Sequence, residues 1–132
     1  MSSVLDASAL LVHLKSETGR ERVAEALLKG AVISLVNWAE VLSTLAKEGK
    51  QPEVVAQQLR AEGLLYQTLR LEPLTDEDCL EIARLRLVTQ KYGLSLGDRA
   101  ALALAKRLDV AVLTADRVWV ELDVGIKIEV IR

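Results

Sequence analysis

The sequence predicts an α/β fold in three layers (α/β/α), with a mainly parallel central sheet. The first observation is that short aliphatic runs of strand length alternate with longer segments of helical periodicity. The second is that residues 31–36 are almost continuously apolar, as is typical of a parallel strand covered on both faces. Because strands that alternate with helices are joined by right-handed crossovers, we expect helices on both sides of the sheet.

The chain begins with a short buried strand at residues 3–6, followed by an apolar helical run at residues 7–14. A second helix is predicted at residues 20–29. Thr18 and Glu21 have the spacing of a capping box at its start, so this helix is expected to open at Thr18.

The next unit pairs a strand at residues 31–36 with a helix that Asn37 is expected to open and that runs to about residue 48. Pro52 suits the first position of the following helix, at residues 52–62, because proline lacks the amide hydrogen that this position leaves unused.

The second half of the chain continues the alternation. A strand is predicted at residues 68–71. Thr75 is expected to cap a long amphipathic helix to residue 91, and Ser95 an Ala-rich and Leu-rich helix to residue 108. The remaining predicted elements are a strand at 110–113, a short helix at 115–120 and an edge strand at 126–130.

The composition is that of a packed domain built from aliphatic side chains. Hydrophobic residues make up 51% of the chain, which contains no Phe, two Trp and two Tyr, so Leu, Val, Ala and Ile must form the core. Disordered chains are poor in these residues. Because 132 residues suit one domain and no linker or repeat interrupts them, we expect a single domain over residues 1–132.

Several functional classes are disfavoured by the same composition. A single cysteine, Cys79, excludes an internal disulfide and a cysteine-rich zinc site. No secretory signal or apolar run of about 20 residues is visible, so we expect a cytoplasmic protein. The formal net charge of −2 argues against a nonspecific nucleic-acid binder.

Acidic residues follow or lie close to the ends of predicted strands. They are Asp6, Glu40, Asp98 and Asp116. Residues just past the carboxyl ends of parallel strands converge on one crevice. Carboxylates gathered there without Lys or Arg repel one another, and a divalent cation is the usual reason that a protein tolerates this. The pattern therefore predicts a metal-dependent active site.

Helix capping is the competing interpretation of these acids. Asn37 with Glu40, and Ser95 with Asp98, have the spacing of a capping box or its acidic variant, and acids are favourable in a first helical turn. A turn or cap role is also open for Asp116. Asp6 is harder to explain in this way, because it interrupts an apolar segment.

Four short motifs resemble the PIN-domain proteins, and in particular the VapC toxins of type II toxin–antitoxin pairs. They are Leu5-Asp6-Ala7-Ser8-Ala9, Asn37-Trp38-Ala39-Glu40-Val41, Leu96-Gly97-Asp98-Arg99-Ala100-Ala101 and Leu113-Thr114-Ala115-Asp116, in the family's order. The resemblance implies a PIN-like α/β/α fold and a Mg²⁺- or Mn²⁺-dependent endoribonuclease that acts as a toxin. It also implies an RNA substrate, a small antitoxin as partner, and a homodimer.

By the same resemblance, Asp6, Glu40, Asp98 and Asp116 are the metal-site and catalytic acids. Their oxygen ligands fit Mg²⁺ or Mn²⁺ better than zinc. Three polar residues, Ser8, Asn37 and Thr114, are expected to hold the carboxylates in place. Two arginines that directly follow site acids, Arg99 and Arg117, are candidates for contacts with substrate phosphates, against an ordinary surface or ion-pair role.

Two other hypotheses remain beside the nuclease. A noncatalytic PIN-like module that binds protein or RNA would use the same groove, with the acids acting mostly as caps. A phospho-aspartate protein also places an Asp after a strand next to Mg²⁺. The phosphatase form of that site needs a second Asp where this chain has Ser8, and no suitable strand-end Lys is present for the receiver form.

Overall fold

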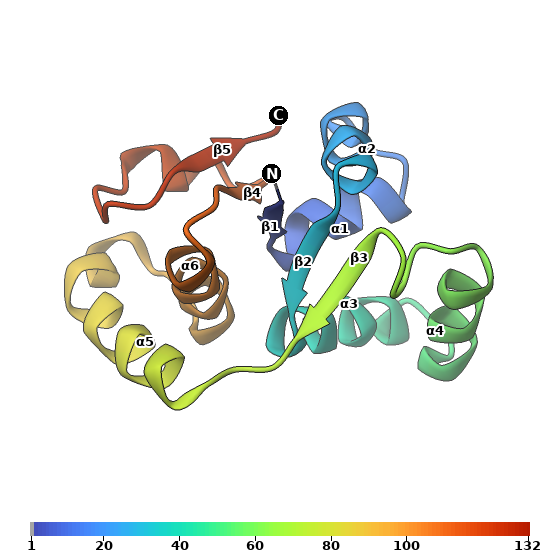
Figure 1. The fold of residues 1–132 in the computed structure, drawn as a ribbon, viewed down its shortest axis with the longest axis horizontal. Helices are drawn as coiled ribbons and strands as arrows, with labels where there is room; N and C mark the ends of the chain where they lie inside the picture. The colour runs from blue at the N-terminus through green and yellow to red at the C-terminus, as the bar shows by residue number, and fades with distance from the viewer. Residues whose placement is uncertain (1) are drawn as a thin grey trace.

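The computed structural model describes residues 2–132 and places helices on both faces of a five-stranded sheet (Figure 1). The strands are β1 (Ser3–Leu5), β2 (Ala31–Ser34), β3 (Leu69–Glu72), β4 (Val112–Thr114) and β5 (Ile128–Val130). The α-helices are α1 (Ala7–Leu14), α2 (Arg20–Leu28), α3 (Leu35–Lys47), α4 (Pro52–Ala61), α5 (Asp76–Thr89) and α6 (Leu96–Leu108). Two short 3₁₀ helices are η1 (Gln90–Tyr92) and η2 (Arg117–Glu121).

The sheet has the strand order β3-β2-β1-β4-β5, and each neighbouring pair is parallel. Val4 in β1 is in register with Val32 in β2 on one side and with Val112 in β4 on the other. The last strand, β5, lies at the edge beside β4, as predicted. The three-layer α/β/α prediction is thus confirmed.

The three central strands, β2, β1 and β4, send alternate side chains into two separate hydrophobic clusters. Leu5, Ile33 and Leu113 pack on the face covered by α1, α2, α3 and α4. Val4 and Val32, one residue earlier, pack on the other face, against α5 and α6. Burial on both faces explains why these strands contain almost no polar residues.

Helix starts differ from the predictions at two places. The strand predicted to reach residue 36 ends at Ser34, whose side-chain oxygen accepts a hydrogen bond from the backbone N–H of Asn37 and caps α3. Asn37 is therefore the third residue of the helix and not its cap. At α2 the cap residue is Gly19, with φ of 103° and no side-chain cap, so the cap predicted at Thr18 is wrong.

The strand order defines where a site can form. The chain leaves β1 for β2 on one side, and it later returns to β4 on the other side of β1, so a topological switch point lies between β1 and β4. In parallel sheets of this kind, ligands bind beyond the carboxyl ends of the strands at that point. Within residues 2–132, no helix has the length and apolar character needed to cross a membrane.

Candidate active site

Asp6 lies directly after β1, at the switch point, and is only 4% exposed. It is the cap residue of α1, and its Oδ1 accepts a 2.8 Å hydrogen bond from the backbone N–H of Ala9. Capping alone does not require burial. The depth of this carboxylate is therefore a separate feature of the site.

Two hydroxyl groups, one from α1 and one from β4, complete the surroundings of the Asp6 carboxylate. Ser8 Oγ donates to Oδ1 at 2.7 Å, and Thr114 Oγ1 donates to Oδ2 at 2.6 Å. Each hydroxyl also accepts a backbone N–H from the chain after β4, Ser8 from Ala115 and Thr114 from Asp116. The two hydroxyls thus join the ends of β1 and β4 through Asp6.

Glu40 reaches the same edge of the sheet from α3. Its Oε1 accepts a 2.8 Å hydrogen bond from Nδ2 of Asn37, which also donates to the backbone oxygen of Gly97 at 2.9 Å. Asn37 is buried and Glu40 is half-buried. This bridge holds Glu40 against Gly97 in the first turn of α6.

Asp98 and Asp116 are more exposed, and each is used as a helix cap. Asp98 and Ser95 form a reciprocal capping box at the start of α6, as the sequence predicts. Asp116 caps η2 by accepting a hydrogen bond from the backbone N–H of Val118. The structure thus confirms part of the capping interpretation, whereas Asn37 and Glu40 do not form a capping box at a helix start.

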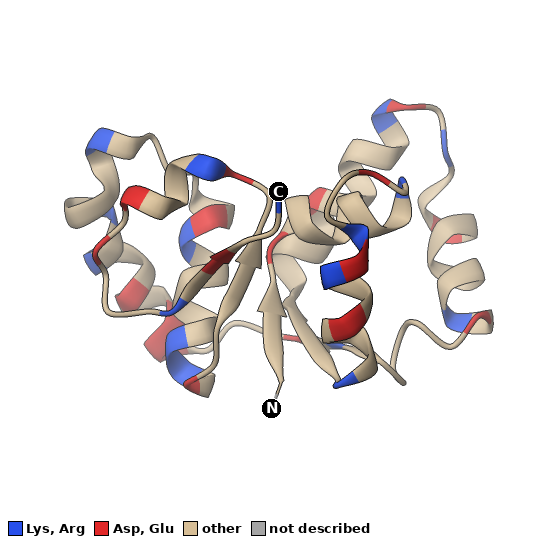
Figure 2. Ribbon diagram, turned by 90° about the horizontal axis from the view of Figure 1, so that it is seen from above, with Lys and Arg blue, Asp and Glu red and all other residues tan. Residues whose placement is uncertain are grey.

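All four acids therefore lie in or next to the first turns of helices that begin at one edge of the sheet. Figure 2, which draws acidic residues in red, shows red segments beyond the tips of the central strands. Helix N-termini carry a partial positive charge, which partly offsets the repulsion among nearby carboxylates.

No cation neutralises this group of acids within residues 2–132. The ion pairs found there involve other acidic residues, and none includes Asp6, Glu40, Asp98 or Asp116. Burial is the largest cause that raises the pKa of Asp6, from 3.8 to about 6, and the negative charge of Asp98 adds to it. The hydrogen bonds from Thr114, Ser8 and Ala9 act in the opposite direction.

The oxygen atoms around Asp6 fit a hard divalent cation. They belong to carboxylate and hydroxyl groups, which are the ligands that such ions prefer. The described residues, 2–132, nevertheless contain no group of three or more acidic, His or Cys side chains close enough to hold an ion as they stand. Ligation of one ion by three or more of these acids therefore requires side chains to move.

The two arginines predicted as phosphate contacts have different surroundings. Arg99 is 7% exposed, and its Nη1 donates to the backbone oxygen of Ile82 in α5. In this position the guanidinium packs between two helices and faces α5, so a contact with substrate requires the Arg99 side chain to move. Arg117 is exposed, and its Nε donates to the backbone oxygen of Arg132.

Two residues that support the site were not singled out by the sequence reasoning. Ser34 donates through Oγ to Asn37 Oδ1 at 2.6 Å. Gly97 faces the Glu40 carboxylate so closely that a β-carbon there would lie 2.6 Å from Oε2. Gly97 occurs in one of the four motifs, but its steric role depends on a residue 57 positions earlier in the chain.

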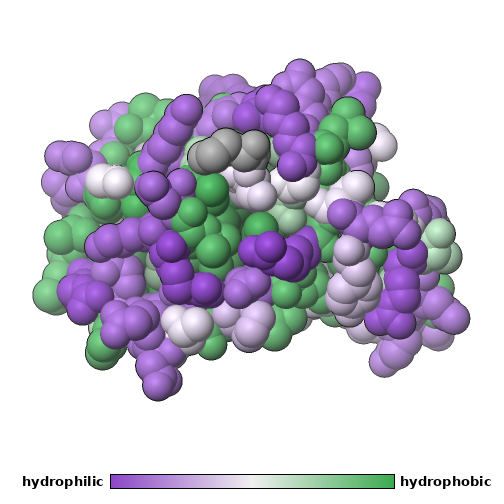
Figure 3. Space-filling view, viewed as in Figure 1, coloured by the Kyte–Doolittle hydropathy of each residue, from purple (hydrophilic) through white to green (hydrophobic). Residues whose placement is uncertain are grey.

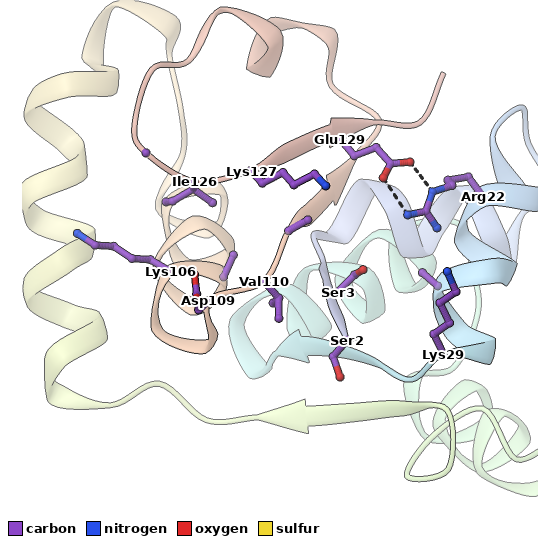
Figure 4. Close-up of a pocket in the computed structure, with 14 residues that line it drawn as sticks. Ser2, Ser3, Arg22, Lys29, Lys106, Asp109, Val110, Ile126, Lys127 and Glu129 are labelled. Atoms are coloured by element: carbon purple, nitrogen blue, oxygen red, sulfur yellow. Dashed lines mark hydrogen bonds and ion pairs between the residues drawn. The ribbon is translucent and has the colours of Figure 1, made fainter.

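A cavity of about 480 Å³ lies at the opposite end of the sheet, around the start of β1 (Figure 4). Basic residues contribute to its lining, but Arg22 is held by Glu129 and Lys106 pairs with Glu81. The face drawn in Figure 3 has mixed hydrophobic and hydrophilic surface. The C-terminal ends of α2 and α6 meet at this cavity. None of the four acids lines it.

Comparison with solved structures finds the same fold in proteins from several bacteria. VapBC2 from Rickettsia felis, bound to a DNA fragment from its promoter, aligns with a TM-score of 0.74 and 17% identity over 98% of both chains. VapC20 of Mycobacterium tuberculosis, a Sarcin-Ricin loop cleaving toxin, gives a TM-score of 0.70 and 16% identity over 96% of this chain and 99% of that one. VapBC-5 from the same organism gives a TM-score of 0.62 and 25% identity over 99% of this chain and 98% of that one.

Comparison with curated proteins gives no match. The family model of the PIN domain matches residues 3–125, which include all four acids and every strand except β5. Because this match covers nearly the whole chain, the protein belongs to the PIN domain family.

Proposed function

We propose that this protein is a metal-dependent endoribonuclease and the VapC-type toxin of a toxin–antitoxin pair. The observation that carries the proposal is the Asp6 carboxylate, which is buried at the switch point with an acidic neighbour and no cationic partner. A fold does not usually retain such a group for stability alone, because removing a charge from water is costly.

In this proposal Asp6 and Asp98 bind Mg²⁺ or Mn²⁺ directly, and Glu40 and Asp116 bind directly or through water. Ser8 and Thr114 keep the Asp6 carboxylate in one orientation through their hydroxyl hydrogens. The bound ion would supply an activated water molecule and stabilise the oxygen that leaves the phosphodiester. Helix N-termini at the same edge add donors suited to phosphate oxygens.

RNA as substrate and a small antitoxin as partner are supported by the structural relatives. One is described as a toxin–antitoxin complex from Klebsiella pneumoniae and another as a Sarcin-Ricin loop cleaving toxin. We extend both features to this chain, together with homodimerisation, as parts of the proposal.

The proposal is tested by incubating purified, antitoxin-free protein with a mixed pool of small RNAs in Mn²⁺. Parallel reactions contain EDTA, or an Asp6→Asn variant shown to be folded by circular dichroism. The proposal expects discrete products that require both the metal and Asp6. Full activity of Asp6→Asn, or cleavage that persists in EDTA, would contradict it.

The noncatalytic alternative makes a different prediction for the same reactions. A binding module would retain RNA on the protein without new ends, and the retention would not depend on Asp6. Native gels of the reaction mixtures, run beside the denaturing gels, separate the two outcomes.

A further inference from the structure

We propose that Ser34 is a positioning residue for the acidic site, because its hydroxyl fixes the Asn37 amide in the orientation that holds Glu40 against Gly97. Ser34 lies at the end of β2 and is fully buried. Its side chain forms hydrogen bonds with Asn37 and not with any of the four acids. The effect of Ser34 on catalysis rests on the proposed nuclease function. Its effect on the orientation of the Asn37 amide is independent of that function.

The Ser34 hydroxyl makes two hydrogen bonds with the same residue. Oγ accepts the backbone N–H of Asn37 at 3.0 Å, which caps α3. The hydroxyl hydrogen is then free to be donated to Asn37 Oδ1 at 2.6 Å. A hydroxyl has one hydrogen and two acceptor lone pairs, so both bonds are compatible. One is a capping bond, and the other determines where the amide oxygen lies.

The Asn37 amide is satisfied on both sides in this orientation. With Oδ1 turned to Ser34, the two Nδ2 hydrogens are directed to Glu40 Oε1 and to the backbone oxygen of Gly97. If the amide were flipped, its oxygen would face these two acceptors, and no hydrogen would lie between them. A partly satisfied buried network of this kind is unfavourable. Ser34 therefore acts on Glu40 through Asn37.

The amide can be observed by itself, because Asn37 is the only asparagine in the chain. Protein labelled with side-chain ¹⁵N asparagine gives one NH₂ group, whose two hydrogens report separately on the bonds to Glu40 and Gly97. We expect both hydrogens of the wild-type protein to exchange slowly with water. Rapid exchange of either hydrogen in the wild-type protein would contradict the proposal, and this test needs neither substrate nor metal.

Ser34→Ala is the variant that tests the hydroxyl, and Thr75→Ala is its matched control. Thr75 also caps a helix through its side chain, but at the start of α5 and away from the acids. We expect faster exchange of the Asn37 NH₂ group in Ser34→Ala and unchanged exchange in Thr75→Ala. Ser34→Thr, which keeps the hydroxyl, is expected to restore slow exchange.

RNA cleavage gives the second readout. Loss of a residue that orients a metal ligand commonly lowers activity by about tenfold or more. We expect this loss in Ser34→Ala, little change in Thr75→Ala at a temperature where both are folded, and recovery in Ser34→Thr. Equal effects of Ser34→Ala and Thr75→Ala on exchange and cleavage would reduce Ser34 to an ordinary cap.

The two proposals fail in different ways. An inactive wild-type protein whose Asn37 hydrogens are protected would overturn the nuclease and leave the positioning by Ser34 intact. If Ser34→Ala does not fold, the wild-type protein and Ser34→Thr decide: slow exchange of both Asn37 hydrogens in the two proteins supports the positioning by the hydroxyl, and rapid exchange in either overturns it.

Discussion

The Glu40 carboxylate occupies the space that a side chain at position 97 would need. A β-carbon on Gly97 would lie 2.6 Å from Glu40 Oε2, which is closer than any ordinary contact. Gly97 is in the first turn of α6 and is not among the residues with positive φ, so backbone conformation does not explain the glycine. The approach of a side chain from α3 does.

Gly97→Ala is therefore expected to destabilise the protein when Glu40 is present and to stabilise it when Glu40 is replaced by alanine. In the wild-type background the added methyl group displaces the Glu40 carboxylate from the Asn37 amide, and losing a hydrogen bond to a charged group costs about 1.5–3 kcal/mol. In a Glu40→Ala background the clash is absent, and alanine is favoured over glycine in a helix by up to about 1 kcal/mol. Urea denaturation of the four proteins measures both effects. The same sign in both backgrounds would show that Glu40 does not constrain position 97.

Stability of the metal-free protein is expected to fall with rising pH because of Asp6. Its pKa is about 6 in the folded protein, against 3.8 for the ordinary carboxyl group, so between these values the folded state binds the proton more tightly than the unfolded chain. Its contribution to the unfolding free energy is thus present at low pH and is lost as pH rises through about 6. We expect the wild-type protein to lose about 2 kcal/mol relative to Asp6→Asn between about pH 4.5 and about pH 7.5.

That comparison is made by chemical denaturation in EDTA, so that no ion offsets the charge of Asp6. Referring each value to Asp6→Asn removes the pH dependence of the other groups. A stability difference that stays constant over this range would show that the folded protein does not raise the pKa of Asp6.

The two arginines that follow site acids are expected to behave differently when they are replaced by methionine. On the proposal that Arg117 contacts a substrate phosphate, Arg117→Met weakens RNA binding and reduces the slope of log affinity against log salt by about one. Arg99→Met should alter stability alone, because the Arg99 side chain is buried against α5. Fluorescence anisotropy with labelled RNA at several salt concentrations checks both. An unchanged slope in Arg117→Met would remove this residue from the binding surface.

Most of the fold follows from the sequence because the strands are short, apolar and regularly separated by helices. The bounds of α1 agree with the prediction, and those of α4 and α6 agree to within one residue. The error at α3 has a local cause. Residues 35 and 36 extend the apolar run of β2, but Ser34 caps the helix first. Apolar character does not distinguish a strand end from a buried first helical turn.

The site was predictable in part for the same reason. Strand ends and motif order single out Asp6, Glu40, Asp98 and Asp116, but their roles as metal ligands stay predictions. The burial of Arg99 depends on how α5 packs against α6. The contact between Gly97 and Glu40 depends on how α3 approaches α6. Such contacts between distant segments are set by tertiary packing, which periodicity along the chain does not describe.

The central claim is that the acids act together as one site for a divalent cation, and isothermal titration with Mn²⁺ tests it most directly. Asp109→Asn is the matched control, because Asp109 lies outside the site at φ of 56°, a conformation that asparagine tolerates. The account predicts equal Mn²⁺ binding by the wild-type protein and Asp109→Asn, and binding at least about tenfold weaker in Asp6→Asn and Asp98→Asn. Wild-type affinity in Asp6→Asn would contradict it.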